Sequence, residues 1–228
     1  RKSTAGERGK GNMQIKSVAV LGAGAVGSYV IWGLSSRKDI RLVVIAEGPR
    51  AERLKQQGIT INGTTYHPQV WTPQEANGVD LLVVALKYGA LPGALDSIAA
   101  AVGPNTTVMS LMNGVDSEEI IAAKIGAEHV LPSLIYGELA APLKSERVQA
   151  VEALLAGTGI HSRVTPYIKE EIWSKFRLNV CNNLPQAILG AGVGCYQSSA
   201  HMKAISDGLC HELEAIAVAK GIDLSKVD

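Results

Sequence analysis

Three polar side chains recur at four-residue intervals in the largely apolar stretch of residues 170–188. Lys175, Asn179 and Asn183 occupy positions i, i+4 and i+8, so each is rotated by only about 40° from the one before around an α-helix. Asparagine is a weak helix former, so the spacing predicts a polar stripe that faces a cleft within apolar packing. A solvated helix face is the alternative. Pro185 lacks an N–H and predicts a kink or break in this helix.

A lysine followed by two amides suits the reduction of a carbonyl group. Hydride transfer to a carbonyl leaves an alkoxide that must be protonated or held by a cation. Lys175 fits this role, because partial burial would lower its pKa toward the working pH. Asn179 and Asn183 each offer a donor and an acceptor that could orient the substrate. Glu171 precedes the lysine by four residues and could pair with it, although an ordinary surface pair is the more common outcome.

Two further polar residues end apolar runs that are typical of buried strands. Lys87 ends the run LLVVALK, and Asn113 ends the run TVMSLMN. Ligands of parallel α/β sheets bind at the carboxyl ends of strands, so both residues are candidates for a binding site. The lysine can also be just the first solvated residue after its strand, and Asn113-Gly114 can be only a turn. Their joint placement favours the functional interpretation.

The run VAVLGAGAVGSYV carries Gly22, Gly24 and Gly27 at GxGxxG spacing, directly after an apolar strand and before a helical pattern. In a dinucleotide-binding turn these glycines allow the tight turn, the approach of the pyrophosphate and close packing of helix on strand. The N–H groups at the helix start would face the phosphates. A tight turn without a ligand is the alternative, but the flanking elements favour NAD or NADP. The expected cofactor-binding residues of this turn are Gly22, Ala23, Gly24, Ala25, Val26 and Gly27.

The end of the second strand leaves the choice of dinucleotide open. Glu47 stands twenty residues after Gly27, where an acidic group would bind the ribose 2′-hydroxyl of NAD. Arg50 follows three residues later and could grip the 2′-phosphate of NADP with its guanidinium group. Arg37 and Arg53 are also close in the sequence. Glu47 could equally be a solvated loop charge.

Alternating strand and helix patterns predict the frame that would position these residues. Short apolar runs are typical of buried parallel strands, and glycines follow the helical stretches where C-caps are expected. The expected strands are Val18–Leu21, Arg41–Ala46, Leu81–Leu86, Thr107–Met112 and Val130–Ile135. The expected helices are Val26–Leu34, Arg50–Gln57, Leu91–Ala101 and Ser117–Ile125. Repeated βα units predict an α/β fold with a doubly wound, mostly parallel Rossmann sheet.

Two stretches depart from this alternation. Asn62-Gly63 separates two β-prone runs and predicts a small hairpin within residues 59–70, which would decorate the sheet domain. After Ser145 the pattern is helical throughout. The helices expected there are Glu146–Leu155, Lys169–Ile188 and His201–Lys220.

These patterns predict two domains. We expect a dinucleotide-binding domain over residues 13–165 and a second, all-α domain over residues 166–228, which would bind substrate or form a dimer and looks incomplete at its C-terminus. Residues 1–12 are polar and rich in Gly, Lys and Arg. They are typical of an expression remnant before a native start at Met13.

Composition narrows the class of protein. The 228 residues are 46% hydrophobic and 19% charged, which is ordinary for a soluble globular protein. The formal net charge of +1 gives no large positive field that would attract nucleic acid. Three cysteines without a CxxC pair favour a reduced, cytoplasmic setting over a disulfide framework or a zinc site. No apolar run reaches the ~20 residues that span a bilayer, so no membrane partner is expected. Apolar stripes on a helical second domain favour a homodimer.

Together the motifs resemble the ketopantoate reductase (2-dehydropantoate 2-reductase) family. The resemblance rests on GAGAVG, the strand-end Lys87, MNG at Asn113 and the helix WSKFRLNVCNN, and it spans most of the chain. It implies a two-domain enzyme that reduces 2-dehydropantoate to pantoate with NADPH, a step toward pantothenate and coenzyme A. It also implies that Lys175 is the catalytic lysine and that Asn179 and Asn183 bind substrate. Lys87 and Asn113 would line the cleft for cofactor and substrate.

The chain departs from the family pattern at three places. The family's substrate-binding serine and catalytic glutamate fall beyond Asp228, and family members carry further strands near Tyr136-Gly137. Glu47 stands where many members have the arginine that grips the 2′-phosphate. We therefore expect NADP from the resemblance, with Arg50 as a cofactor contact, and keep NAD open because of Glu47.

The leading hypothesis is a cytoplasmic, NADP-dependent 2-keto-acid reductase that transfers a hydride to the keto group of 2-dehydropantoate, with Lys175 as general acid. One alternative is a reductase of another small keto acid or an imine, which a substrate panel would separate. Another is a non-catalytic, NAD(P)-binding regulatory protein. A gene that continues past Asp228 with a serine and a glutamate would argue against that alternative.

Overall fold

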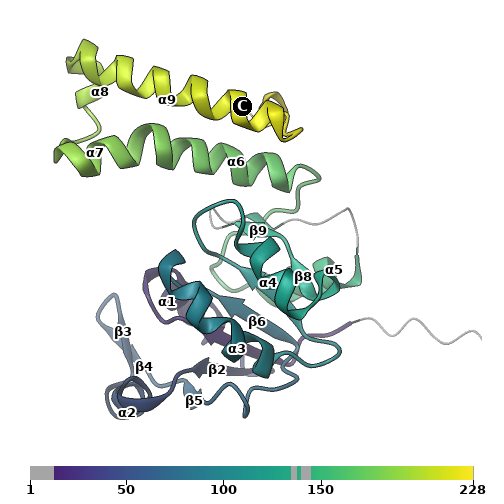
Figure 1. Ribbon diagram of the computed structural model, residues 1–228. Coiled ribbons are helices and arrows are strands. Elements are labelled where there is room, and N and C mark those ends of the chain that lie inside the picture. The colour runs from purple at the N-terminus through teal and green to yellow at the C-terminus, as the bar shows by residue number, and fades with distance from the viewer. Residues whose placement is uncertain (1–12, 135–137, 140–144, 228) are drawn as a thin grey trace, which may run out of the picture.

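The computed structural model describes residues 13–134, 138–139 and 145–227, and a parallel six-stranded sheet forms its centre (Figure 1). The strands of this sheet are β1 Ser17–Leu21, β2 Arg41–Ile45, β5 Gln69–Trp71, β6 Leu81–Val84, β7 Thr107–Ser110 and β8 Val130–Leu131. They lie in the order β5-β2-β1-β6-β7-β8, which is the order of a Rossmann sheet. All strands are parallel, and the sheet grows from β1 first toward β5 and then, from β6 onward, toward β8. The predicted doubly wound α/β fold is confirmed.

Helices cover both faces of this sheet. They are α1 Ala25–Leu34, α2 Gly48–Gln57, α3 Leu91–Ala101, α4 Ser117–Ile125 and α5 Glu146–Leu155. Successive side chains of a strand point to opposite faces. In β1, Val18 and Val20 pack in one hydrophobic cluster with α1, α2 and α5, whereas Ala19 and Leu21 pack in a second cluster with α3 and α4. Strands buried on both faces explain why the strand runs are apolar without alternation.

β6 and β7 each end two residues earlier than the sequence predicts. β6 ends at Val84 rather than Leu86, and β7 ends at Ser110 rather than Met112. β6 lies between β1 and β7, and the last residues of these two strands, Leu21 and Ser110, both lie opposite Val84. The residues that follow Val84 therefore have no neighbouring strand with which to pair, and they form a loop at the carboxyl edge of the sheet.

The strand predicted over residues 130–135 divides into two. Pro132 lacks an N–H and interrupts the ladder. β8 ends before it, and Ser133–Leu134 form β9, which pairs antiparallel with β10, Glu138–Leu139. Ile135 and the short passage at Tyr136-Gly137 lie outside the described residues.

The predicted hairpin forms, but the residues after it do not merely decorate the sheet. β3 (Ile59–Ile61) and β4 (Thr64–Tyr66) pair antiparallel, and Asn62 and Gly63 adopt φ angles of 48° and 81°, which suit a two-residue type I′ turn. Val70 then belongs to β5, which adds a parallel edge strand to β2. β5 could not be predicted from the sequence, because a three-residue strand shows no periodicity.

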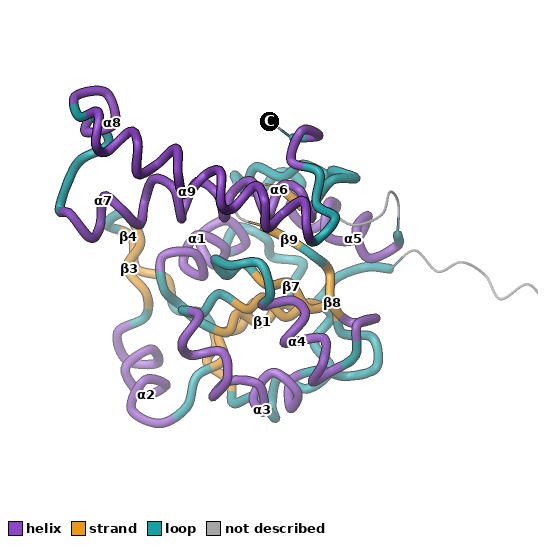
Figure 2. Tube along the Cα trace, turned by 45° about the horizontal axis from the view of Figure 1, so that its top comes forward, coloured by secondary structure: helices purple, strands orange, loops and turns teal. Residues whose placement is uncertain are grey.

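A helical hairpin follows the sheet domain, so the predicted all-α second part is confirmed. Its helices are α6 Ile168–Leu178, α7 Leu184–Leu189, α8 Cys195–Ser198 and α9 Ala200–Ala219, with a π-helical turn at Asn179–Asn183. α6 and α9 run antiparallel, side by side in both views (Figures 1 and 2). Their contact buries Trp173, Leu213 and Ala217. Short 3₁₀-helices lie at Tyr88–Ala90, Ala127–His129 and Leu224–Lys226.

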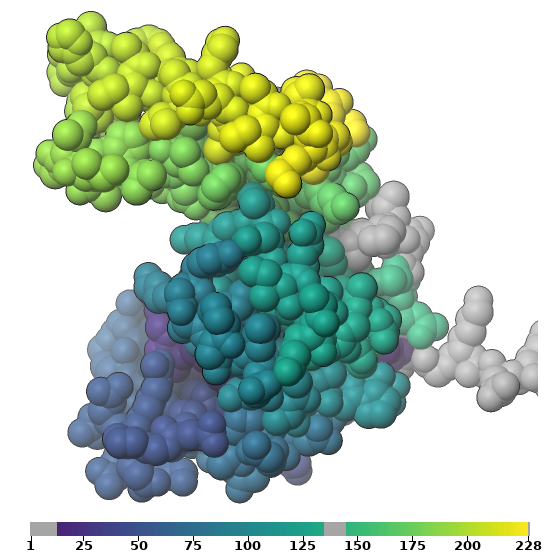
Figure 3. Space-filling model, viewed as in Figure 1, coloured from purple at the N-terminus to yellow at the C-terminus, as the bar shows by residue number. Residues whose placement is uncertain are grey.

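The hairpin stands over the sheet domain, and its α7 and α8 end overhangs that domain (Figure 3). Ile168 and Ile172 of α6 pack against Leu134 of β9. Val115, from the loop after β7, packs against the core of the hairpin. These few apolar contacts set how far α6 lies from the carboxyl edge of the sheet. No helix within the described ranges is long and apolar enough to cross a membrane.

Candidate active site

The turn after β1 is so crowded that only glycine fits at two positions. Gly22 has a φ of +104°, and a Cβ there would lie 2.6 Å from the carbonyl oxygen of Ala85. A Cβ on Gly27 would lie 1.9 Å from the carbonyl oxygen of Gly22 and 3.3 Å from Val20 of β1. The first turn of α1 therefore packs directly against β1 and the glycine turn. The contacting atoms belong to the backbone, which cannot move aside for a side chain.

Gly24 and the start of α1 are open instead. No atom lies within 4 Å of a Cβ built on Gly24. Gly24 is the N-cap of α1, and the helix start has neither a side-chain cap nor an acidic residue in its first turn. The first N–H groups of a helix have no partner within it, and the positive end of the helix dipole favours an anion. The turn therefore fits the pyrophosphate of a dinucleotide.

Loops after β6 and β7 meet at the same carboxyl edge. Lys87 is exposed on the first of them, and Asn113 is exposed on the second. The hydroxyl of Tyr88 donates to Asp116 Oδ2 at 2.7 Å, and the Cβ position of Gly114 lies 3.7 Å from the Tyr88 ring. These contacts join the two loops, so the structure places Lys87 and Asn113 on neighbouring segments beside the glycine turn.

Glu47 and Arg50 lie together at the end of β2, the strand next to β1. Glu47 is exposed and is the N-cap residue of α2, and its side chain makes no capping hydrogen bond. Arg50 is exposed in the first turn of the same helix. An acid and a cation therefore both stand where the 2′ substituent of a dinucleotide is read.

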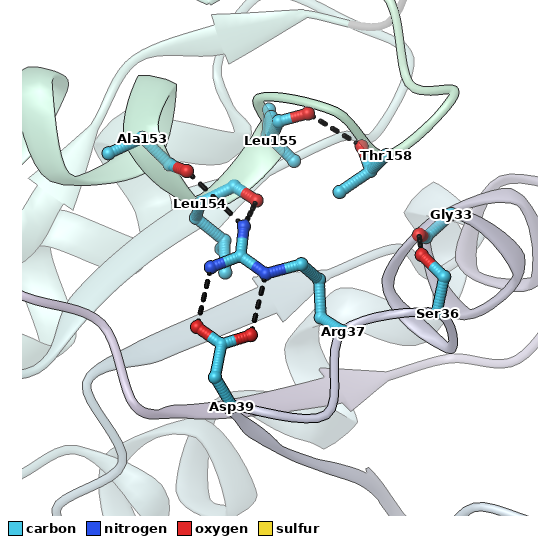
Figure 4. A network of polar contacts seen from close by, with 8 residues as sticks. All are labelled: Gly33, Ser36, Arg37, Asp39, Ala153, Leu154, Leu155 and Thr158. Atoms are coloured by element: carbon cyan, nitrogen blue, oxygen red, sulfur yellow. Dashed lines mark hydrogen bonds and ion pairs between the residues drawn. The ribbon is translucent and has the colours of Figure 1, made fainter.

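Arg37 does not reach this edge of the sheet. It lies between α1 and β2, at the opposite end of the strand, where Nε and Nη2 donate to the two carboxylate oxygens of Asp39 at 2.8 Å each (Figure 4). This pairing lowers the pKa of Asp39 to about 2. Nη1 donates to the carbonyl oxygens of Ala153 and Leu154 at the end of α5. Arg37 thus fastens the end of α5 to the loop between α1 and β2, and its closeness in sequence to Glu47 was misleading.

The polar stripe of α6 continues onto the π-helical turn. α7 begins after this turn with Pro185 in its first turn. The wider turn absorbs the missing N–H of the proline, so the predicted break is a change of helix type. Asn183 Nδ2 donates to Asn179 Oδ1 at 2.8 Å, which places the two amides on one face, as the spacing predicted.

A small pocket lies where α6 meets the loop after β7. Lys175 and Asn179 line it from α6 and the π-helical turn, and Asn113 lines it from the sheet domain. Lys87 and Asn183 are not part of this lining, and both are exposed. The lining residues are Met112, Asn113, Gly114, Glu118, Ser133, Leu134, Ile172, Lys175, Phe176 and Asn179.

Burial lowers the pKa of the Lys175 ammonium group below its ordinary value, in the direction that the sequence analysis expected. The shift arises because desolvation disfavours the charged form. It brings the group closer to the range in which a lysine gives up its proton readily. Glu171 was the other residue expected to influence the pKa of Lys175. Its Oε1 instead lies 2.8 Å from Arg163 Nη2, in an ion pair, and burial is the cause of the lysine's shift.

The sequence analysis missed one titratable residue of the pocket. Glu118 lies in the first turn of α4 and lines the pocket, and burial raises the pKa of its carboxyl group. Ser117 Oγ donates to Glu118 Oε2 at 2.9 Å. Acidic residues are common at helix starts because they complement the helix dipole. Nothing in the sequence therefore distinguished Glu118 from its exposed neighbour Glu119.

Comparison with known proteins relates both parts of the chain to one family. The sequence profile of "Ketopantoate reductase PanE/ApbA" matches residues 18–151, and that of "Ketopantoate reductase PanE/ApbA C terminal" matches residues 167–228. The chain is 25% identical to a 2-dehydropantoate 2-reductase of Mesorhizobium japonicum, over 90% of this chain and 77% of that protein. It is 29% identical to a 2-dehydropantoate 2-reductase of Caulobacter vibrioides, over 92% and 76% of the two chains.

Solved structures show the same architecture. A putative ketopantoate reductase of Ralstonia solanacearum superposes with a TM-score of 0.80 at 23% identity, over 90% of this chain and 77% of that one. The 2-dehydropantoate 2-reductase of Geobacter metallireducens gives a TM-score of 0.76 at 26% identity, over 90% and 76%. A D-mandelate dehydrogenase solved with NADH and anilino(oxo)acetate gives 0.77 at 20% identity, over 91% and 75%, and shares the fold.

Proposed function

Because this chain belongs to the ketopantoate reductase family, a family of nicotinamide-dinucleotide-dependent oxidoreductases, we propose that it reduces the keto group of 2-dehydropantoate to give pantoate, in pantothenate biosynthesis. One observation carries the proposal. Lys175 and Asn179 of the hairpin line one pocket together with Asn113 of the sheet domain. This pocket lies at the same edge of the sheet as the glycine turn, which fits a pyrophosphate. The same pocket could instead take another small keto acid or an imine.

The residues of this pocket supply the proton chemistry and the orientation of the substrate. A nicotinamide bound at this edge of the sheet supplies the hydride. Lys175 donates a proton to the keto oxygen as negative charge develops there, and its lowered pKa favours release of that proton. Asn179 orients the substrate with its amide group, and Asn183 holds that amide in place through the 2.8 Å hydrogen bond.

Residues of the carboxyl edge would hold the dinucleotide. The glycine turn, residues 22–27, would bind the pyrophosphate, and Lys87 and Asn113 would lie beside the nicotinamide half. We propose NADP as the cofactor, with Arg50 on its 2′-phosphate, because the relatives of Mesorhizobium japonicum and Caulobacter vibrioides are 2-dehydropantoate 2-reductases, and the resemblance to that family implies NADPH. Glu47 and the fold relative solved with NADH support NAD as the alternative.

Two substitutions at the end of β2 test the choice of dinucleotide. Glu47→Ala removes an acid that would repel a 2′-phosphate, so we expect the preference for NADPH over NADH, measured as a ratio of kcat/KM, to rise by about tenfold. Arg50→Ala should lower it by a similar factor. Arg53→Ala, on the same helix, serves as the matched control. An unchanged ratio in both test variants would mean that the end of β2 does not read the 2′ position.

A substrate panel tests the reaction itself. The oxidation of NADPH and NADH would be followed with 2-dehydropantoate, with other 2-keto acids, including the keto acid of D-mandelate, and with a cyclic imine. Fastest turnover of 2-dehydropantoate is the expected result. Faster turnover of another compound would replace the substrate. Dinucleotide binding without any turnover would instead favour a regulatory protein.

The organisation of the chain completes the proposal. We place the domains at residues 13–165 and 166–228, with the boundary at Thr165-Pro166, just before α6 begins. We also propose a homodimer, because Ile188 and Val218 of the hairpin are apolar and more than two-thirds exposed. Light scattering on the purified protein tests this directly, and a monomer at micromolar concentration would refute the dimer.

A further inference from the structure

Glu118 lies in the candidate active site without a part in the mechanism above. From α4 it lines the same pocket as Lys175, Asn179 and Asn113. It also lines a wider groove between α4 and the hairpin, together with Ile172. The side chains of Glu118 and Ile172 therefore form the wall between the groove and the pocket. The carboxyl group interacts with the backbone of Ser133, which lines the pocket but not the groove, so it lies on the pocket side of this wall.

Several contacts hold this carboxyl group in place. Ser117 Oγ donates to Glu118 Oε2 at 2.9 Å, and the buried Ser117 also shares a 2.8 Å hydrogen bond with Ser110 at the end of β7. The backbone of Ser133 on β9 also interacts with the carboxyl group. Turning Glu118 out toward water would break these hydrogen bonds within a buried region. The group is thus preorganised at the pocket.

The surroundings of Glu118 favour its neutral form. Burial is the largest influence and raises the pKa of the carboxyl group, whereas the hydrogen bonds from Ser117 and from the backbone favour the ionised form without offsetting burial. The negative charge of Asp116 adds to the effect of burial. The other charged groups around it are Glu119 on α4, Lys169 and Lys175 on α6, and Lys220 after α9. A neutral carboxylic acid has an O–H that can donate a hydrogen bond.

We propose that Glu118 is a substrate-binding residue, whose neutral carboxyl group donates a hydrogen bond to the carboxylate of the keto acid. The inference rests on the proposed function, because it requires an anionic substrate in this pocket. Lys175 attracts the anion by charge, and Glu118 fixes its orientation without adding a charge. When Glu118 ionises as the pH rises, it loses the donor and repels the substrate.

Binding without turnover gives the most direct test. The affinity for 2-dehydropantoate would be measured by calorimetry with the oxidised dinucleotide present, from pH 5 to pH 9. For the unmodified protein we expect the dissociation constant to rise by up to about tenfold per pH unit once Glu118 ionises, with uptake of a proton on binding above that point. Deprotonation of Lys175 would also weaken binding, and the Glu118→Gln variant separates the two effects.

Three variants separate the role of Glu118 from a structural one. Glu118→Gln keeps a hydrogen-bond donor that cannot ionise, so its affinity should stay within about threefold of the low-pH value of the unmodified protein, without the dependence on pH. Glu118→Ala should bind at least about tenfold more weakly at low pH. Glu119→Gln, one residue along the same helix and exposed, should behave like the unmodified protein.

The outcomes distinguish this proposal from the proposed function. If Glu118→Gln followed the same pH dependence as the unmodified protein, Glu118 would not be the group that binds, and the inference would be overturned. If the protein bound dinucleotide but not 2-dehydropantoate, the proposed substrate would be wrong. The series would then use the keto acid that the substrate panel selects, and the lack of any bound keto acid would also overturn the inference. Dinucleotide affinity shows whether Glu118→Ala is folded.

Discussion

The glycine turn and the polar stripe of α6 would serve the same reaction, but backbone atoms form the first and side chains form the second. The turn is made of backbone atoms in contact, such that a single added Cβ on Gly27 would lie 1.9 Å from a carbonyl oxygen. The stripe is made of side chains on a helical hairpin, where Lys175 and Asn179 are half-buried and Asn183 is exposed. A site of backbone atoms cannot accept added atoms, whereas a site of side chains depends on the chemical identity of each group.

The two regions also differ in how firmly they are anchored. The glycine turn continues directly from β1, whose residues are buried on both faces of the sheet. The stripe reaches the pocket only because Ile168, Ile172 and Val115 join the hairpin to the sheet domain. Changes at the crowded glycines of the turn should therefore act on folding and binding together, while changes in the stripe should act on substrate binding and chemistry without affecting folding.

Gly27→Ala should have the largest effect, because its new Cβ would collide with backbone. We expect loss of dinucleotide binding and destabilisation by about 3 kcal/mol or more, measured by calorimetric titration and denaturant unfolding. Gly24→Ala is the informative partner, since open space surrounds that position. It should fold normally and lose only dinucleotide affinity. Normal binding by Gly27→Ala would refute the difference between the regions.

Lys175→Ala should give the next largest effect, and on chemistry only. We expect kcat to fall by a factor of about 10² to 10⁴, with dinucleotide affinity and unfolding free energy unchanged or slightly improved. Because the pKa of Lys175 is lowered, the proton needed for reduction should be lost at a lower pH than for an ordinary lysine, so kcat should decline as pH rises through that value. Lys169→Ala, exposed on the same helix, is the control and should keep full activity.

The two asparagines should differ in effect, although the sequence makes them equivalent. Asn179→Ala removes an amide from the pocket lining and should raise KM for the keto acid by about tenfold, the equivalent of one lost hydrogen bond to substrate. Asn183→Ala removes only the support of that amide and should raise KM by about threefold. Steady-state kinetics on both variants would decide. Equal effects would mean that Asn183 also contacts the substrate.

Tyr88→Phe should have the smallest effect of the series. It removes the hydroxyl that bonds to Asp116 at 2.7 Å and loosens the loops of Lys87 and Asn113, so dinucleotide affinity should fall by a factor of about 2 to 5. Tyr167→Phe, an exposed tyrosine outside these loops, is the matched control. A loss as large as that of Gly24→Ala would show that side chains, and not only backbone, control the cofactor half.

The sequence predicted structure well wherever the signal was local. The limits of α3 and α4 are as predicted, because Pro92 fits the first turn of α3 and Gly126 caps α4 with a φ of +99°. The Asn62-Gly63 turn likewise depends on its own two residues. β5 and the early end of β6 depend on pairing with β2 and β1 instead. Such pairing partners lie elsewhere in the chain and leave no local pattern.

For the candidate site, the sequence by itself determined the glycine turn and the single face shared by Lys175 and Asn179, because spacing within one element sets both. Only the tertiary structure decided which residues meet. It placed Asn179 in the pocket and Asn183 outside it, and it brought Glu118 from the sheet domain to the same pocket as the lysine. The reason is physical: burial, and the pKa shifts that follow from it, arise where elements pack together.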